Sequence, residues 1–196
     1  MIIETIISSQ NQDGAVNFAP MGVHISHQVL NLSEVREIGL CLYSGSQTFI
    51  NLHTTLEGVV NFTDDVLIFV ETALFSPDYP TCPSRFVQPP RLASAQKIWE
   101  FTVTNFDASQ EPAKVHGQIK HDEELAGWGG FCRAQWAVLE AAIAATRWQR
   151  IPFRKIKNAW ILWQEIVEKT GGTREREALN RVREFFNQKG LEIDHK

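Results

Sequence analysis

The first two thirds of the chain carry their apolar residues in short runs that are typical of β-strands. β-branched residues dominate the segment 2–9, and residues 99–106 and 114–122 alternate apolar with polar side chains, as half-buried strands do. Turn-forming residues separate neighbouring runs at 11–14 and 107–112. We therefore expect strands at residues 2–9, 15–19, 23–29, 37–43, 58–62, 99–106 and 114–122.

Two short helices and a proline-rich segment complete this part of the pattern. We expect helices at residues 48–53 and 64–73, the second with Thr63 as its N-cap. Residues 76–90 hold five of the eight prolines, which excludes a regular element there. A loop of this length in a compact domain is expected to be functional or to contact a partner.

The pattern changes near residues 127–130, after which apolar residues recur three and four positions apart, as they do on one face of a helix. Thr170-Gly171-Gly172 is a helix stop, and Thr173 can cap a following helix. The stripes of the three expected helices are Cys132, Trp136, Leu139 and Ile143; Ile156, Trp160, Trp163 and Val167; and Leu179, Val182 and Phe186. We expect a mainly β fold with α: a β-barrel over residues 1–126 and a helical subdomain over residues 127–196.

Composition narrows the class of protein without identifying it. The chain has 196 residues, of which 43% are hydrophobic and 21% charged, so a folded core is expected. Its formal charge of −4 gives no overall field for nucleic acid. The sequence has no apolar run long enough for a membrane span and no basic segment before its first apolar residues. We expect a cytoplasmic protein with neither a nucleic-acid nor a membrane partner.

Metal and thiol chemistry find little support in the sequence. His24 and His27 are three positions apart, which points them to opposite faces of a strand. No cysteine pair or acidic cluster accompanies them, so we expect no metal site. The cysteines at positions 41, 82 and 132 are far apart and lie in a strand, in the proline-rich loop and on an apolar helical face. We expect them to be structural rather than nucleophilic.

Residues 44–51 favour an anion site over a nucleotide-triphosphate loop. Ser44, Gly45 and Ser46 leave a strand and enter a short helix, where small residues bare backbone N–H groups and hydroxyls add donors. The lysine and spacing of a triphosphate loop are missing. A monophosphate is the expected ligand, and an ordinary capped turn is the alternative.

The segment Gly14–Gly22 suggests a second ligand surface. Pro20 fixes the backbone and is expected to interrupt the strand, while Gly22 allows a close approach. Asn17 offers both a donor and an acceptor. Such a segment can lie along a flat heterocycle, and a strand bulge at the proline is the alternative.

Four motifs in this order resemble a known family. They are Glu4-Thr5; Gly14-x-x-Asn17-x-Ala19-Pro20-Met21-Gly22; Gly45-Ser46-x-Thr48-x-x-Asn51-Leu52; and Asn61 before an acidic pair. The set resembles the FMN-binding split-barrel proteins of the flavin reductase type. It is most similar to an archaeal and bacterial family of such flavoproteins that ends in a helical subdomain. Arg133-Ala134, residues 138–147 and Thr170-Gly171-Gly172 fit that ending, whereas Cys132 stands where the family would have Asn.

The resemblance implies a fold, a cofactor and a set of binding residues. Family members are split barrels that form homodimers and hold FMN in the groove between subunits. By matching positions, Thr48 and the Ser44–Ser46 backbone would bind the phosphate, Asn51 would support that loop and Asn61 would come from the strand behind it. The isoalloxazine ring would lie against Asn17, Ala19, Pro20 and Met21. His116 and Arg147 are further candidates, because each could reach a groove; the resemblance assigns no acid or base.

Three functions remain open on this basis. The first is an FMN-dependent oxidoreductase that uses a pyridine nucleotide or a pterin, since the family is often linked with tetrahydromethanopterin one-carbon metabolism. The second is a non-catalytic flavin-binding or electron-carrier protein. The third is a barrel that holds a deazaflavin or haem, or serves as an interaction module.

The helical end leaves two further alternatives. Trp136, Trp148, Trp160 and Trp163 could form a partner surface or an aromatic core where helices pack. The basic cluster from Arg147 to Lys157 could attract an anionic ligand or be a solvated face.

Overall fold

The computed structural model describes residues 1–26, 28, 31–127 and 132–193. Its contacts divide the chain into two compact units, Met1–Thr63 with Asp78–Trp128 and Asp64–Pro77 with Gly129–Lys196. The pattern change near 127–130 lies largely outside the described residues. The separate strand expected at 23–29 is wrong: residues 23 and 24 end strand β2 (Val16–His24), and residues 25, 26 and 28 lie in no strand. No helix in the described ranges is both long enough and apolar enough to cross a bilayer.

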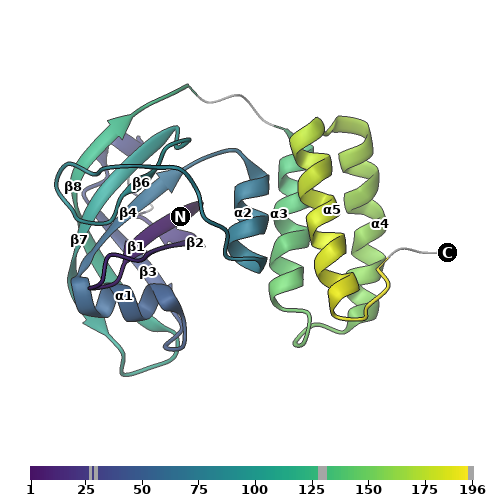
Figure 1. Ribbon diagram of the computed structural model, residues 1–196, viewed down its shortest axis with the longest axis horizontal. Helices are drawn as coiled ribbons and strands as arrows, with labels where there is room; N and C mark the ends of the chain where they lie inside the picture. Colours follow the sequence, from purple (N-terminus) through teal and green to yellow (C-terminus); the bar gives the residue numbers. More distant parts are fainter. Residues whose placement is uncertain (27, 29–30, 128–131, 194–196) are drawn as a thin grey trace. The chain divides into compact units, whose positions relative to one another are not determined.

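The first unit is a closed antiparallel barrel with strand order β1-β2-β3-β8-β7-β4 (Figure 1). A 3-10 turn (Leu32–Glu34) precedes strand β3, and helix α1 (Gln47–Thr55) follows that strand. A separate two-stranded sheet pairs β5 (Thr81–Cys82) with β6 (Arg91–Leu92). The expectation of no regular element at 76–90 is therefore wrong at residues 81–82, which lie between the prolines at 80 and 83. The barrel strands are β1 (Ile2–Gln10), β2 (Val16–His24), β3 (Glu37–Leu42), β4 (Glu57–Phe62), β7 (Lys97–Asp107) and β8 (Ala113–Glu124).

Strand β2 runs without a break through Pro20, contrary to the expected interruption at residues 20–22. Pro20 is paired with Ile6 of β1. Hydrogen bonds at the two ends of the β1–β2 ladder show which residues bond across it. Met1 and Ile25 form two backbone hydrogen bonds, each of 3.0 Å, and the Asn11 N–H donates to the Ala15 carbonyl at 3.0 Å. Bonded pairs alternate along an antiparallel ladder.

This alternation explains how the proline is accommodated. Odd-numbered residues of β2 bond to β1, so the N–H and C=O groups of even-numbered residues point to the other edge. Pro20 is even-numbered, so its nitrogen faces away from β1. The N–H that proline lacks is therefore not needed for the β1–β2 ladder. Within the described residues, β3 pairs with β2 only at His24 and Gly39. Most of that edge of β2 is consequently free of strand pairing.

The barrel core is built around one large ring. Phe101 of β7 is fully buried, and it lies against Gly58 of β4 and Gly117 of β8. A Cβ added to these glycines would meet the ring at 2.6 and 2.7 Å, respectively. The two glycines therefore leave the space that the Phe101 ring fills.

The second unit is a helical bundle of α2 (Val66–Leu74), α3 (Arg133–Thr146), α4 (Phe153–Thr170) and α5 (Thr173–Gln188) (Figure 1). Helix α2 packs on α3 and α5, so four helices share a core where the pattern predicted three. Its N-cap is Asp65, whose carboxylate accepts the Leu67 N–H at 3.1 Å, rather than the expected Thr63. The division of the chain at 126 and 127 into two domains stays a prediction.

The expected apolar stripes are right for two helices and wrong for the third. The stripes of α4 and α5 are buried, including Trp160 and Trp163. On α3 the buried face is instead made of small residues, while Trp136 is 51% exposed. Alanine side chains let helices approach closely, and a search for large residues overlooks them. The buried residues of α3 are Ala134, Ala137, Val138, Ala141, Ala142, Ala144 and Ala145.

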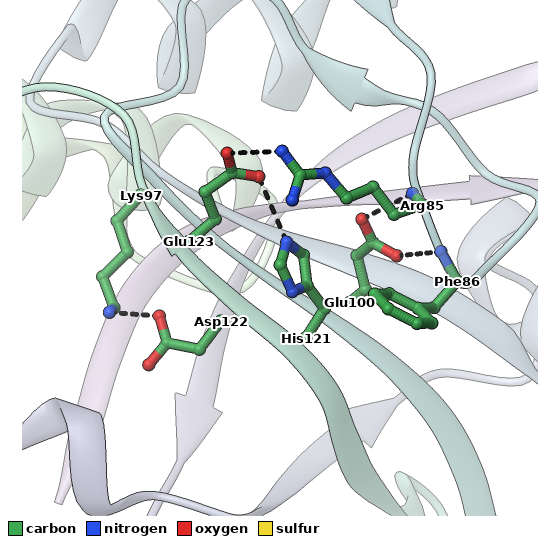
Figure 2. A network of polar contacts seen from close by, with 7 residues as sticks. All are labelled: Arg85, Phe86, Lys97, Glu100, His121, Asp122 and Glu123. Atoms are coloured by element: carbon green, nitrogen blue, oxygen red, sulfur yellow. Dashed lines mark hydrogen bonds and ion pairs between the residues drawn. The ribbon is translucent and has the colours of Figure 1, made fainter.

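The proline-rich segment is fastened to the barrel by carboxylates (Figure 2). Glu100 of β7 is fully buried and accepts the backbone N–H groups of Arg85 at 2.8 Å and Phe86 at 2.6 Å. Farther along, the Gln88 N–H donates to Glu57 at 2.8 Å. An otherwise irregular loop thus has its amides satisfied by acidic side chains.

A second set of contacts holds the side chains around this loop (Figure 2). Glu123 accepts from His121 Nε2 and from Arg85, both at 3.1 Å. The hydrogen bond from His121 lowers the pKa of the Glu123 carboxyl, and the Arg85 charge adds to this effect. Lys97 is paired with Asp122 nearby. Phe86 remains 62% exposed, at a centroid distance of 5.3 Å from the His121 ring.

We predict that Glu100→Gln will loosen the loop. The amide can still accept one N–H, but its NH₂ group would face the other, so one of these two part-buried hydrogen bonds is lost. We expect backbone exchange of Arg85 and Phe86 to quicken about tenfold, measured by hydrogen exchange on peptides covering residues 83–90. Glu124→Gln is the matched control because its side chain is 81% exposed. Equal protection in both variants would contradict this account.

Candidate functional site

The corner between β3 and α1 is the centre of the expected site. After Leu42 the chain closes a turn in which the Ser46 N–H donates to the Tyr43 carbonyl at 2.9 Å. Ser46 then caps α1, and its Oγ accepts the Phe49 N–H at 3.2 Å. A helix begins here because the serine satisfies one of the donors that a first turn leaves open.

Three other donors of this corner remain available. Within the described residues, the N–H groups of Gly45, Gln47 and Thr48 have no protein acceptor. Gly45 and Gln47 are exposed, and a Cβ added to Gly45 would meet nothing within 4 Å. No lysine or arginine side chain of the described residues bonds to residues 44–48. The corner can therefore bind an anion through backbone donors and the helix N-terminus.

Buried polar side chains connect this corner to strands β1 and β2 through hydrogen bonds. Thr48 and Asn51 are each 1% exposed. The Asn17 Nδ2 donates to Thr48 Oγ1 at 3.1 Å, which ties β2 to the first turn of α1. Asn51 accepts from Gln47 at 2.7 Å and donates to Ser9 at 3.1 Å. The structure thus brings together Asn17, Thr48 and Asn51, which sequence reasoning placed in one site.

The open edge of β2 provides a second surface. By the alternation of the ladder, the N–H groups of Phe18 and Gly22 point away from β1 along this edge. Asn17, Ala19 and Met21 pair with Ser9, Ile7 and Thr5 of β1. Met21 packs against the barrel core. An extended ligand would accordingly meet backbone groups and Pro20 here, and contacts with Ala19 and half-buried Met21 stay predictions.

Gly22 has a packing reason that the sequence did not reveal. A Cβ at this position would lie 2.7 Å from Cγ2 of Ile2 on the paired strand. A larger residue at position 22 would therefore make the Ile2 side chain shift, and this packing relation holds whether or not a ligand approaches.

Asn61 lies away from the surface of the corner. It is fully buried, and its Nδ2 donates to the Ile6 carbonyl at 3.0 Å and Ser8 Oγ at 3.1 Å. Its Oδ1 accepts the Leu92 N–H at 2.8 Å. These contacts join β4 to β1 and β6, which is a bracing role. A contact of Asn61 with a ligand stays a prediction.

His116 and Arg147 are not brought into this corner by any described contact. His116 is exposed on β8, paired with Gly39 and Asn105. Arg147 is exposed at the C-terminal end of α3, in the helical unit. Their roles in binding stay predictions.

Sequence reasoning missed one residue of the corner. Glu111, in the turn between β7 and β8, accepts the Ser44 N–H on its Oε1 at 3.0 Å. In the same turn, hydrogen bonds from Ser109 lower the pKa of the Asp107 carboxyl. No local motif marks Glu111; it reaches Ser44 because β8 pairs with β3 up to Leu42.

Metal ligands are not gathered in the described parts of the chain. No group of three or more His, Cys, Asp or Glu side chains there is placed to hold a metal ion. His24 Nε2 lies 3.9 Å from the Cys41 thiol, and His27 is outside the described residues.

Comparison with known proteins places these features in context. Residues 3–126 match the family described as protein of unknown function (DUF447), N-terminal domain, and residues 132–184 match the accompanying DUF447 family. No curated protein sequence matches the chain.

Solved structures share the fold and confirm the predicted fold class. An FMN-bound DUF447 protein of Methanosarcina mazei has a TM-score of 0.79 and 21% identity over 94% of each chain. A flavoredoxin of Methanosarcina acetivorans has a TM-score of 0.53 and 15% identity, covering 63% of this chain and 69% of that one. A 2-nitrobenzoate 2-nitroreductase of Pseudomonas fluorescens has a TM-score of 0.51 and 20% identity, covering 62% and 64%.

Proposed function

The chain belongs to the DUF447 family, and we propose that it is a flavoprotein that binds FMN. The observation that carries the proposal is the β3–α1 corner, where the backbone N–H groups of exposed Gly45, exposed Gln47 and buried Thr48 have no protein acceptor among the described residues. The FMN-bound relative of the same family supports it. Asn17, Thr48 and Asn51, which come from two of the four motifs that suggested a flavin site, lie at this corner.

The corner suits the phosphate of FMN. The N–H groups of Gly45, Gln47 and Thr48 would donate to its oxygens, and the N-terminus of α1 favours a negative charge there. Asn17 and Asn51 would hold the first turn of α1 in position through the contacts described above. Such a site needs no lysine, because backbone donors share the charge.

The edge of β2 suits the ring of FMN. Its free N–H groups at Phe18 and Gly22 could donate to the pyrimidine end, where negative charge gathers when the flavin is reduced. Pro20 would present an apolar surface between them. When bound, the cofactor itself supplies hydride and electron transfer, and the chain supplies position and exclusion of water.

We predict that Gln47→Pro will weaken FMN binding about tenfold or more, because it removes one charge-assisted donor. Gln47 is the first residue of α1, where proline is well tolerated. Ser46 already has the extended conformation (φ −83°, ψ 146°) that proline requires before it. Titration with FMN and riboflavin, followed by flavin fluorescence, measures the effect.

Gln47→Ala is the matched control, since it removes the side chain but keeps the N–H group. It should bind FMN more tightly than Gln47→Pro does. Riboflavin lacks the phosphate and should bind both variants alike. If the two variants bound FMN equally well, the phosphate would not lie at this corner.

We propose further that the protein is an oxidoreductase of the flavin reductase type, with a pyridine nucleotide or a pterin as substrate. The nitroreductase among the structural relatives supports a catalytic role. The flavoredoxin relative favours the second candidate, a non-catalytic electron carrier. Pterins are included because the resemblance seen in the sequence implies a link with one-carbon metabolism.

The two candidates differ in how the bound flavin responds to NADH or NADPH. For a reductase we expect the visible absorbance of the holoprotein to fall within seconds under anaerobic conditions. Dithionite serves as the control that the flavin is reducible. If dithionite bleached the holoprotein but NADH, NADPH and a reduced pterin did not, the proposed reductase activity would be contradicted. The electron-carrier function would then be favoured.

We propose that two copies form a homodimer with FMN in the groove between them. Two large apolar side chains beside the corner, Tyr43 and Ile50, are 54% and 49% exposed, and a partner subunit would cover them. We expect light scattering to give twice the mass of the chain and dilution to release FMN as the dimer dissociates. A stable monomer with unchanged FMN affinity would contradict the shared groove.

A further inference from the structure

Glu111 places a protein carboxylate in the candidate phosphate corner. Its Oε1 accepts the Ser44 N–H at 3.0 Å, and Ser44 precedes Gly45, whose N–H is one of the three available donors. Both Ser44 and Glu111 are exposed. The corner therefore already contains one anionic acceptor of its own.

This arrangement is unfavourable for a phosphate dianion. A second anion beside Glu111 adds repulsion, and within the described residues no lysine or arginine side chain bonds to residues 44–48. The charge of Lys114, at the start of β8, acts on the Asp107 carboxylate at the end of β7. The Ser44 N–H is also withdrawn from any ligand as long as Glu111 accepts it. A phosphate must therefore either displace the carboxylate or bind next to it.

We propose that Glu111 is a specificity-determining residue that competes with the ligand's phosphate and keeps FMN exchangeable. The inference rests on the proposed FMN site and deepens it. Glu111 lowers the affinity for phosphorylated flavins while leaving riboflavin unaffected. FMN bound in this way is released more readily than a permanently held cofactor.

The test is the affinity of Glu111→Gln for FMN and for riboflavin. Glutamine keeps the oxygen that accepts the Ser44 N–H but removes the charge. We expect FMN to bind about fivefold more tightly, the size of an exposed charge interaction, and riboflavin to bind as in the wild type. Glu111→Ala removes both charge and acceptor and should change FMN affinity in the same direction.

Glu37→Gln is the matched control. Glu37 is exposed at the opposite end of β3, and its side chain makes no ion pair or hydrogen bond among the described residues. It changes the net charge equally, so it separates a local effect from the overall field. We expect it to leave both affinities unchanged.

The outcomes separate this inference from the proposed function. Tighter FMN binding by both Glu111 variants, with riboflavin and Glu37→Gln unchanged, supports it. Unchanged FMN affinity, or an equal change for FMN and riboflavin, overturns the role of Glu111 while the FMN site stands. If neither the wild type nor any variant bound FMN, the proposed function would fall and this inference with it.

Discussion

The pairing of β2 on one edge alone is the constraint on which the candidate site depends. β1 bonds to the odd-numbered residues of β2, whereas β3 reaches the strand only at His24 and Gly39 in the described chain. The other even-numbered residues of β2 have no strand partner on that edge in the described chain. Because the Asn17–Thr48 bond fixes α1 beside this strand, an open edge and an open helix N-terminus belong to the same part of the barrel.

The fold was predictable where local pattern and burial agree. The alternating runs that became β7 and β8, and the large apolar stripes of α4 and α5, met these conditions. The pattern failed on α3, since its core face consists mostly of alanines. It also failed at Pro20, since the tolerance of a strand for proline depends on which edge its N–H faces. The placement of α2 with the later helices depends on tertiary contacts that no local pattern reports.

The candidate site divides in the same way. Ser44 to Thr48 are adjacent in sequence, so their donors could be inferred from residue types alone. Asn17 and Thr48 are 31 positions apart; a family resemblance assigned both to one FMN site, but their contact with each other was not predicted. Glu111 is 67 positions from Ser44 and belongs to no motif. Its contact arises from the β3–β8 register, which requires the folded barrel.

Pro20 also bears on self-association. An exposed strand edge with a continuous row of donors and acceptors is a template on which another strand can add, and such edges lead to aggregation. Near the middle of β2 the proline removes one donor from that row and places its ring there. A flat aromatic molecule needs few backbone bonds and can still lie along the edge. An incoming peptide strand needs the whole row, so the same residue discourages fibril growth.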